Sequence, residues 1–168
     1  WVGCNRPEKQ AGIYKRTREL GLETTTFQAS ELQNGAVLEM LCSSQVDWVI
    51  LAGFLLRIPE AMVGHFKGRM VNIHPALLPD FGGKGMYGMH VHQAVKAAGC
   101  AESGMTVHWV TPAYDEGDVI FQASCGLEPD DEPEQIAQKV AQLEHRYFAR
   151  TIDALIRDAV AQTSLQHE

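Results

Sequence analysis

The 168-residue sequence predicts an α/β fold: a Rossmann-like, mostly parallel sheet flanked by helices. Short runs rich in β-branched residues alternate with segments whose apolar residues recur at helical spacing. Hydrophobic residues make up 45% of the chain and charged residues 21%, a usual share for a globular domain with a buried core. We therefore expect a single domain over residues 1–162, followed by a tail over residues 163–168.

The N-terminal third predicts two strands and two helices. Residues 1–4 and the threonine-rich residues 22–27 are typical of strands. Residues 8–21 have helical spacing, with Gly21 as the stop signal. Ser30 is placed to cap a second helix, whose inner face would extend to Leu41.

The middle of the chain continues the alternation. Residues 46–52 form a short apolar run, as in a strand buried on both faces. Residues 59–66 predict a short helix and residues 69–73 another strand. The segment 75–88 is rich in proline and glycine and predicts an irregular loop, after which residues 90–98 resume a helix.

The C-terminal part predicts two strands and one long helix. Residues 105–110 alternate between apolar and polar side chains, and residues 119–124 form a second strand beyond the loop 112–118. Asp131 and Glu134 have the spacing of a capping box at the start of the helix.

Composition excludes several classes of partner. The net charge is −7, from 14 basic and 21 acidic residues, which argues against nucleic-acid binding. The longest apolar run, residues 48–56, is far shorter than the roughly 20 residues that span a bilayer, and we expect no signal peptide. The four cysteines form no CxxC pair and predict reduced thiols in a cytoplasmic protein.

Asn72 and His74 are the first candidates for chemistry. They lie two residues apart at the end of a predicted strand, so their side chains can point to the same side, and Pro75 fixes the backbone where the chain leaves the sheet. In α/β sheets, ligands bind beyond such strand ends. An amide and an imidazole can stabilise an oxyanion, and a histidine can also transfer a proton near neutral pH. A structural turn with a hydrogen-bonded histidine is the alternative.

Asp115 is the third candidate, in the acidic turn of the loop 112–118. Such turns are common in loops, so a role in chemistry requires that His74 lie nearby. A carboxylate beside an imidazole favours its charged form and can accept a proton directly or through water.

Two other motifs give weaker signals. The glycine-rich residues 82–88 lack the ending of a phosphate-binding loop and predict a flexible loop beside the site. His90 and His92 form an HxH pair without a cysteine or acidic partner at a recognised spacing, so we expect no metal.

Four segments together resemble the folate-dependent glycinamide ribonucleotide formyltransferases. They are Ile50–Phe54, Asn72–Pro79, Gly88–His92, and Asp115 with Gly117, Val119 and Ile120. The Asn-Ile-His-Pro-x-Leu-Leu-Pro motif is specific to the formyltransferase superfamily, and the Gly-x-His-x-His segment narrows the resemblance to this branch. The resemblance covers the chain from about Val2 to Ala159.

The resemblance implies a reaction. The chain would transfer the formyl group of the co-substrate 10-formyltetrahydrofolate to the amine of glycinamide ribonucleotide, in de novo purine biosynthesis. Asn72 and protonated His74 would stabilise the tetrahedral oxyanion. Asp115 would keep His74 charged and organise the water that relays the amine proton.

The resemblance also implies binding residues. Those expected at the folate are Leu55, Leu56, Arg57, Ile58, Asn72, Thr111 and Asp115. Those expected at glycinamide ribonucleotide are Ala141, Gln142 and Glu144, with Glu144 as the polar candidate. The partners are thus small molecules, with no nucleic acid and no membrane, and a homodimer is kept open.

Departures from the family leave alternatives open. Its first strand and its phosphate loop would precede Trp1 and are expected to be missing from this chain, which begins without a methionine. A formyltetrahydrofolate hydrolase shares the Asn-His-Asp site and uses water as acceptor. A methionyl-tRNA formyltransferase would continue into a basic domain. A non-catalytic folate-binding fragment is the alternative from a different class.

Overall fold

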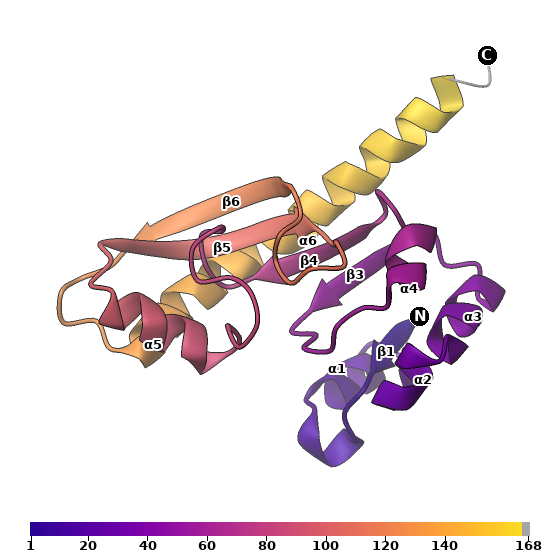
Figure 1. Cartoon of the computed structure of the whole chain (residues 1–168), viewed down its shortest axis with the longest axis horizontal. Coiled ribbons are helices and arrows are strands. Elements are labelled where there is room, and N and C mark those ends of the chain that lie inside the picture. The colour runs from indigo at the N-terminus through magenta and orange to yellow at the C-terminus, as the bar shows by residue number, and fades with distance from the viewer. Residues whose placement is uncertain (166–168) are drawn as a thin grey trace. The chain divides into compact units, whose positions relative to one another are not determined.

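The computed structural model describes residues 1–165, and the side chains of residues 1–162 (Figure 1). The expected α/β class is confirmed, with strands flanked by helices. The chain divides into two compact units. The N-terminal unit comprises Trp1–Val49 and Leu56–Met70, and the C-terminal unit comprises Ile50–Leu55 and Val71–Glu168. The single domain expected over residues 1–162 stays a prediction.

The N-terminal unit contains a parallel strand pair and short helices. Strand β1 (Val2–Cys4) pairs in parallel with β2 (Thr24–Thr26). The helices, in chain order, are the 3₁₀ helix η1 (Glu8–Gln10), α1 (Ile13–Glu19), α2 (Ala29–Gln33), α3 (Ala36–Ser43) and α4 (Glu60–His65).

Two helices expected to be continuous are interrupted. The segment 8–21 is split because Ala11 is extended, with φ −135° and ψ 122°. The segment from Ser30 to Leu41 is split at Gly35, whose φ of 93° lies in the left-handed region that favours glycine. Ser30 is not the cap that we expected, since Gln28 caps α2 and forms a capping box with Glu31.

The C-terminal unit contains most of a four-stranded sheet, ordered β3-β4-β5-β6. The strands are β3 (Val49–Ala52), β4 (Met70–His74), β5 (Glu102–Trp109) and β6 (Val119–Gly126). Both β4–β5 and β5–β6 are antiparallel. The expectation that β3 is buried on both faces is wrong. Every second residue of β3 is exposed, as in a strand with one packed face.

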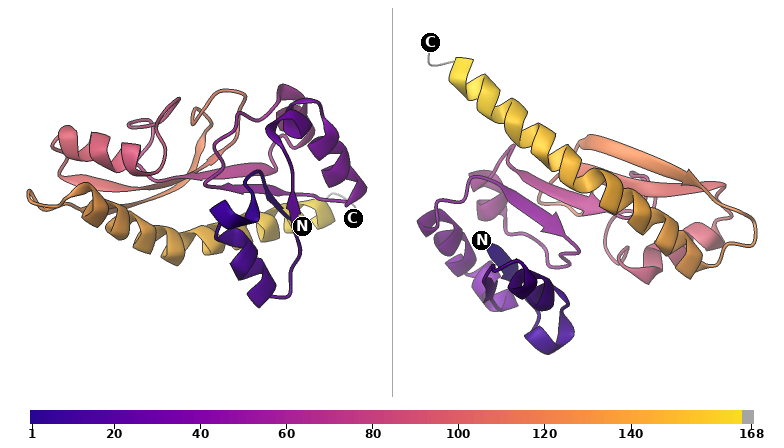
Figure 2. Two further views of the ribbon diagram at one scale, coloured as in Figure 1. Left: turned by 90° about the horizontal axis from the view of Figure 1, so that it is seen from below. Right: turned by 180° about the vertical axis from the view of Figure 1, so that it is seen from behind.

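Two helices complete this unit. They are α5 (Met89–Ala97) and α6 (Pro133–Leu165), and α6 packs on α5, β5 and β6 and continues past the end of the sheet (Figures 1 and 2). The core side chains are almost fully buried: Val91, Val95, Met105, Val107, Ile136 and Val140. Burying each such side chain contributes about 1.5–3 kcal/mol, so these contacts hold α5 and α6 on the sheet.

The start of α6 differs in detail from the sequence prediction. The N–H of Glu132 donates to Oε1 of Gln135 at 2.7 Å, so this pair fills the place expected for Asp131 and Glu134. The carboxylate of Asp131 instead accepts the N–H of Glu128 at 2.8 Å and forms an ion pair with Lys139. Helix α6 includes residues 163–165 of the expected tail, and residues 166–168 lie outside the described part.

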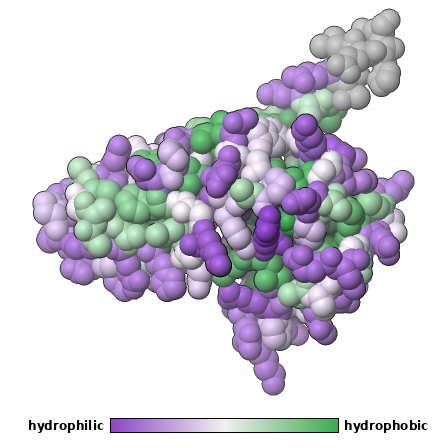
Figure 3. Space-filling model, in the orientation of Figure 1, coloured by the Kyte–Doolittle hydropathy of each residue, from purple (hydrophilic) through white to green (hydrophobic). Residues whose placement is uncertain are grey.

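The surface of the described residues is mixed in polarity. Hydrophobic and hydrophilic residues are interspersed on the face shown in Figure 3. None of the helices in the described part of the chain is long and apolar enough to cross a membrane.

Gly104→Ala is expected to lower the free energy of unfolding by about 1–3 kcal/mol, as overpacking does. An added Cβ at Gly104 would lie 2.1 Å from the carbonyl oxygen of Ala123 on the neighbouring strand, and backbone cannot easily yield. Gly126→Ala, in the same hairpin, is the matched control because its Cβ would meet nothing within 4 Å. Urea unfolding of both variants measures the difference, and equal stability would contradict the packing described for β5 and β6.

Candidate active site

The register between β4 and β5 brings the first candidate residues together. Asn72 lies opposite His108, and His74 lies opposite Thr106. Because residues two apart on a strand share a face and paired residues share it too, all four side chains lie on one face of the sheet. Three of them, His74, Thr106 and His108, are buried. The site is therefore assembled on rigid backbone.

Asp115 lies beside both histidines, as its functional interpretation requires. Its Oδ2 is 3.5 Å from Nδ1 of His74, and its Oδ1 is 3.5 Å from Nε2 of His108. The N–H of Gly83 donates to Oδ2 at 2.9 Å and holds the carboxylate in place. Asp115 itself has a φ of 56°, a conformation in which aspartate and asparagine are enriched. The three candidates Asn72, His74 and Asp115 are thus brought into one cluster.

A backbone contact fixes the protonation pattern of His74. Its Nε2 lies 2.8 Å from the carbonyl oxygen of Phe81. A carbonyl only accepts hydrogen bonds, so Nε2 carries the hydrogen. In the neutral ring, Nδ1 is then unprotonated and faces Asp115.

Burial is the largest influence on the pKa of His74. Burial lowers the pKa of His74 below its ordinary value of 6.5, and it outweighs Asp115 and the Phe81 carbonyl, which both raise that pKa. This direction favours a neutral imidazole in the free site, and the charged His74 implied by the resemblance stays a prediction. Burial alone would raise the pKa of Asp115, but the nearby imidazole of His108, His74 and the N–H of Gly83 hold it below its usual range.

A buried polar network supports the turn that follows His74. The hydroxyl of Thr106 donates to the carbonyl of Ala76 at 2.6 Å and accepts the N–H of Leu78 at 3.0 Å. Nε2 of Gln122 donates to Thr106 Oγ1 and to the carbonyl of Leu78, each at 2.9 Å. This network ties residues 76–78 to β5 and β6. Local sequence patterns do not indicate it, because it depends on pairing between distant strands.

The glycine-rich loop and the histidine pair lie close to this network. Gly83 contacts Asp115 as described, in keeping with a loop beside the site. His92 is buried and its Nδ1 has no hydrogen-bond partner, while burial and His74 lower its pKa. The rings of His90 and Tyr87 are 5.0 Å apart between centroids. Within residues 1–162, no group of three or more His, Cys, Asp or Glu residues is placed to hold a metal ion.

The residues expected to bind folate are divided between the two units. Leu55 and Thr111 belong to the C-terminal unit, whereas Leu56, Arg57 and Ile58 belong to the N-terminal unit. Ile58 is buried there, and the carbonyl of Arg57 accepts a hydrogen bond from Gln33 at 3.0 Å. Thr111 donates to the carbonyl of Ala113 at 3.2 Å within its own loop.

The residues expected to bind the acceptor lie on α6. Ala141 and Glu144 are three residues apart and share a face of the helix, whereas Gln142 is exposed on another. Burial raises the pKa of Glu144, and the neighbouring His145 offsets part of that effect.

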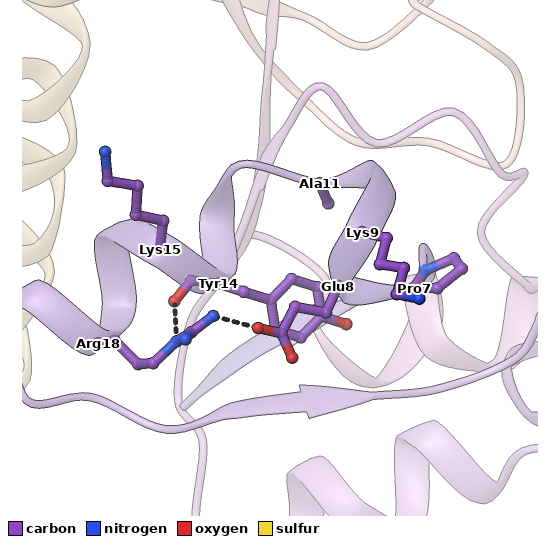
Figure 4. A pocket seen from close by; sticks show the side chains of 7 residues that line it. All are labelled: Pro7, Glu8, Lys9, Ala11, Tyr14, Lys15 and Arg18. Atoms are coloured by element: carbon purple, nitrogen blue, oxygen red, sulfur yellow. Dashed lines mark hydrogen bonds and ion pairs between the residues drawn. The ribbon is translucent and has the colours of Figure 1, made fainter.

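A separate pocket of about 580 Å³ lies in the N-terminal unit (Figure 4). Its lining residues are Pro7, Glu8, Lys9, Ala11, Tyr14, Lys15 and Arg18. Arg18 is held there by an ion pair with Glu8 and by the carbonyl of Tyr14. None of the lining residues is among those expected to take part in formyl transfer.

Comparison with known proteins identifies the family. The family model described as "Formyl transferase" matches residues 5–152, so the chain belongs to the formyl transferase family. The resemblance seen in the sequence is thereby confirmed.

Individual relatives carry the more specific name phosphoribosylglycinamide formyltransferase. The chain is 35% identical over 159 residues to the chloroplastic protein of Arabidopsis thaliana, covering 91% of this chain and 54% of the relative. It is 30% identical over 158 residues to the protein of Bacillus subtilis, covering 91% of this chain and 77% of the relative. The chain thus spans about half the length of the chloroplastic relative.

Solved structures of that name have the same fold. The protein of Anaplasma phagocytophilum gives a TM-score of 0.83 at 28% identity, covering 94% of this chain and 74% of its own. The protein of Streptococcus pneumoniae gives 0.81 at 30% identity, covering 93% and 86%. A formyltetrahydrofolate deformylase from Pseudomonas syringae, at 20% identity and a TM-score of 0.76, shares the fold alone.

Asp115→Asn is expected to lower the pKa of His74 further, because Asp115 is a cause that raises it. Asparagine tolerates the positive φ of this position, so the loop should be kept. Asp118→Asn, in the same loop, makes the same change of net charge without a contact to His74 and is the control. NMR titration of the histidine ring protons measures the pKa. A higher pKa in Asp115→Asn would contradict the electrostatic role of Asp115 described above.

Proposed function

We propose that this chain transfers the formyl group of 10-formyltetrahydrofolate to the amine of glycinamide ribonucleotide in de novo purine biosynthesis. The observation that carries the proposal is the cluster of Asn72, His74 and Asp115 at the end of β4. Its support is membership of the formyl transferase family, with relatives named phosphoribosylglycinamide formyltransferase.

The reaction requires a group that holds one proton. The amine loses a proton as its nitrogen bonds to the formyl carbon, and N10 of the folate gains one as its bond to that carbon breaks. A neutral imidazole with an unprotonated nitrogen can take that proton and return it. His74 fits this task, because its Nδ1 is unprotonated in the neutral ring and faces Asp115.

The site would then gain a positive charge on His74 as the reacting formyl group gains a negative charge. As the formyl oxygen becomes an oxyanion, the amide of Asn72 donates to it. His74, protonated at Nδ1, would become an imidazolium whose two N–H groups face Asp115 and the Phe81 carbonyl, and its positive charge would stabilise the nearby oxyanion. Donors held in place in a buried site usually contribute more to such catalysis than any other single effect. In this proposed order His74 is neutral before the amine attacks, whereas the resemblance implies a His74 that is already charged.

The residues that would bind the two substrates are also proposals that rest on the family resemblance. Leu55, Leu56, Arg57, Ile58 and Thr111 would border the folate ring. Ala141, Gln142 and Glu144 would contact glycinamide ribonucleotide. The cytoplasmic location, the homodimer and the absence of a bound metal also stay predictions, and relatives include chloroplastic proteins.

One assay decides between the proposed function and its alternatives. Release of tetrahydrofolate is followed with and without glycinamide ribonucleotide, and the formylated product is identified by mass. Turnover that requires the nucleotide supports the transferase. Turnover without it indicates the hydrolase, and folate binding without turnover indicates a non-catalytic protein.

His74→Ala is expected to reduce kcat by about 10²–10³, because the positive charge near the oxyanion and the proton acceptor are lost together. The Kd for the folate should stay near that of the unchanged chain. His65→Ala, which removes an exposed imidazole from α4, is the control. Near wild-type turnover in His74→Ala would remove His74 from the mechanism.

Glu144→Gln is expected to raise the KM for glycinamide ribonucleotide by about 10- to 100-fold, the usual effect of losing a hydrogen bond to a charged group. The KM for the folate should not change. Glu134→Gln, at the exposed start of the same helix, is the matched control. If both variants kept the wild-type KM, α6 would have no part in acceptor binding.

A further inference from the structure

His108 is a buried histidine of the site to which neither the sequence nor the relatives' names assign a role. It is 2% exposed and lies on β5 directly opposite Asn72. Its Nδ1 is 2.9 Å from the carbonyl oxygen of Trp109. Its Nε2 is 3.0 Å from Nδ2 of Asn72 and 3.5 Å from Oδ1 of Asp115.

These contacts select one tautomer of the ring. The Trp109 carbonyl can only accept, so Nδ1 carries a hydrogen. In the neutral ring Nε2 is then bare and accepts a hydrogen bond from Nδ2 of Asn72. This hydrogen bond fixes the orientation of the Asn72 amide. An amide turned by 180° has the same shape but would place its oxygen, which cannot donate, against Nε2.

The carbonyl that selects the tautomer is itself closely packed. A Cβ added at Gly117 would come within 1.7 Å of the Trp109 oxygen, so the loop before β6 lies directly against that carbonyl. The N–H of Trp109 donates to the carbonyl of Asp118 at 3.0 Å. The N–H and the carbonyl of Trp109 are therefore both held by the loop before β6.

We propose that His108 is a positioning residue for formyl transfer. With Nδ1 donating to the Trp109 carbonyl and Nε2 accepting from Asn72, it fixes the Asn72 amide so that the second hydrogen of Nδ2 is available to the formyl oxygen. The effect of His108 on turnover rests on the proposed function. The tautomer and the orientation of the amide are properties of the site itself and do not depend on it.

The first experiment reads the tautomer directly. The intact chain is labelled with ¹⁵N-histidine, and long-range ¹H–¹⁵N correlations are recorded near pH 7.5, with His108→Gln used for assignment. We expect the His108 hydrogen on Nδ1, beside the Trp109 carbonyl, and the His74 hydrogen on Nε2, beside the Phe81 carbonyl. A His108 hydrogen on Nε2 would overturn the proposal.

The second experiment compares two substitutions. His108→Leu removes the acceptor, and because small misplacements of a reacting group cost up to roughly 100-fold, we expect kcat to fall by about that factor with KM little changed. In His108→Gln the side-chain oxygen can take the place of Nε2 and accept from Asn72, so most of kcat should return. Thermal unfolding of both variants separates a folding defect from a loss of positioning. Equal kcat in the two variants would contradict the proposal.

A double-mutant cycle tests whether His108 acts through Asn72. If it does, His108→Leu should cost little further turnover in an Asn72→Ala background, whereas independent roles would multiply their losses. Multiplicative losses would overturn the proposal. A wild-type chain without formyl transfer would instead refute the proposed function, and the NMR tautomer would still decide the assignment of His108.

Discussion

The site depends on the antiparallel register between β4 and β5. That register sets Asn72 against His108 and His74 against Thr106, so one pairing of two strands supplies two of the proposed reacting groups and the groups that support them. A shift of the register by one residue would turn each of these side chains to the opposite face of the sheet. The core packing of Met105 and Val107 on the other face of β5 opposes such a shift, because both side chains are fully buried there and would lose that packing. Hydrophobic burial thus enforces polar geometry.

Asp115 joins this rigid face to a loop. Its two oxygens each face one histidine nitrogen that has no hydrogen in the neutral ring. When both rings are neutral, the negative charge of Asp115 has no positive partner among these two histidines. A proton added to either nitrogen would then lie beside one of the carboxylate oxygens. Such a site is suited to storing a proton for a short time. Burial lowers the pKa of His74, which is consistent with the proposed role, because a base that must return its proton should not hold it tightly.

The sequence predicted those parts of the site that local patterns encode. The spacing of Asn72 and His74 at a strand end predicts their part in the site, whereas Asp115 is predicted through the resemblance to the formyltransferases, because acidic turns are common. His108 was missed as a site residue, since only the pairing of β4 with β5 brings it to Asn72, and the strand pattern does not distinguish it from its neighbours. The helix interruption at Gly35 was also not predicted, because the local pattern there continues although the helix does not. The apolar spacing continues across it, but a single left-handed residue ends one helix and starts another.

The contacts from the glycine-rich loop are made by its backbone. The carbonyl of Phe81 holds the hydrogen of His74, and the N–H of Gly83 holds the carboxylate of Asp115. Order in the loop and charge in the site are therefore linked, and such linkage is reciprocal. Whatever orders residues 81–83 also favours an ionised Asp115, and a protonated Asp115 loosens the loop. The hydrogen-exchange rate of the Gly83 amide would thus report the ionisation of the site, although no side chain of Gly83 takes part in it.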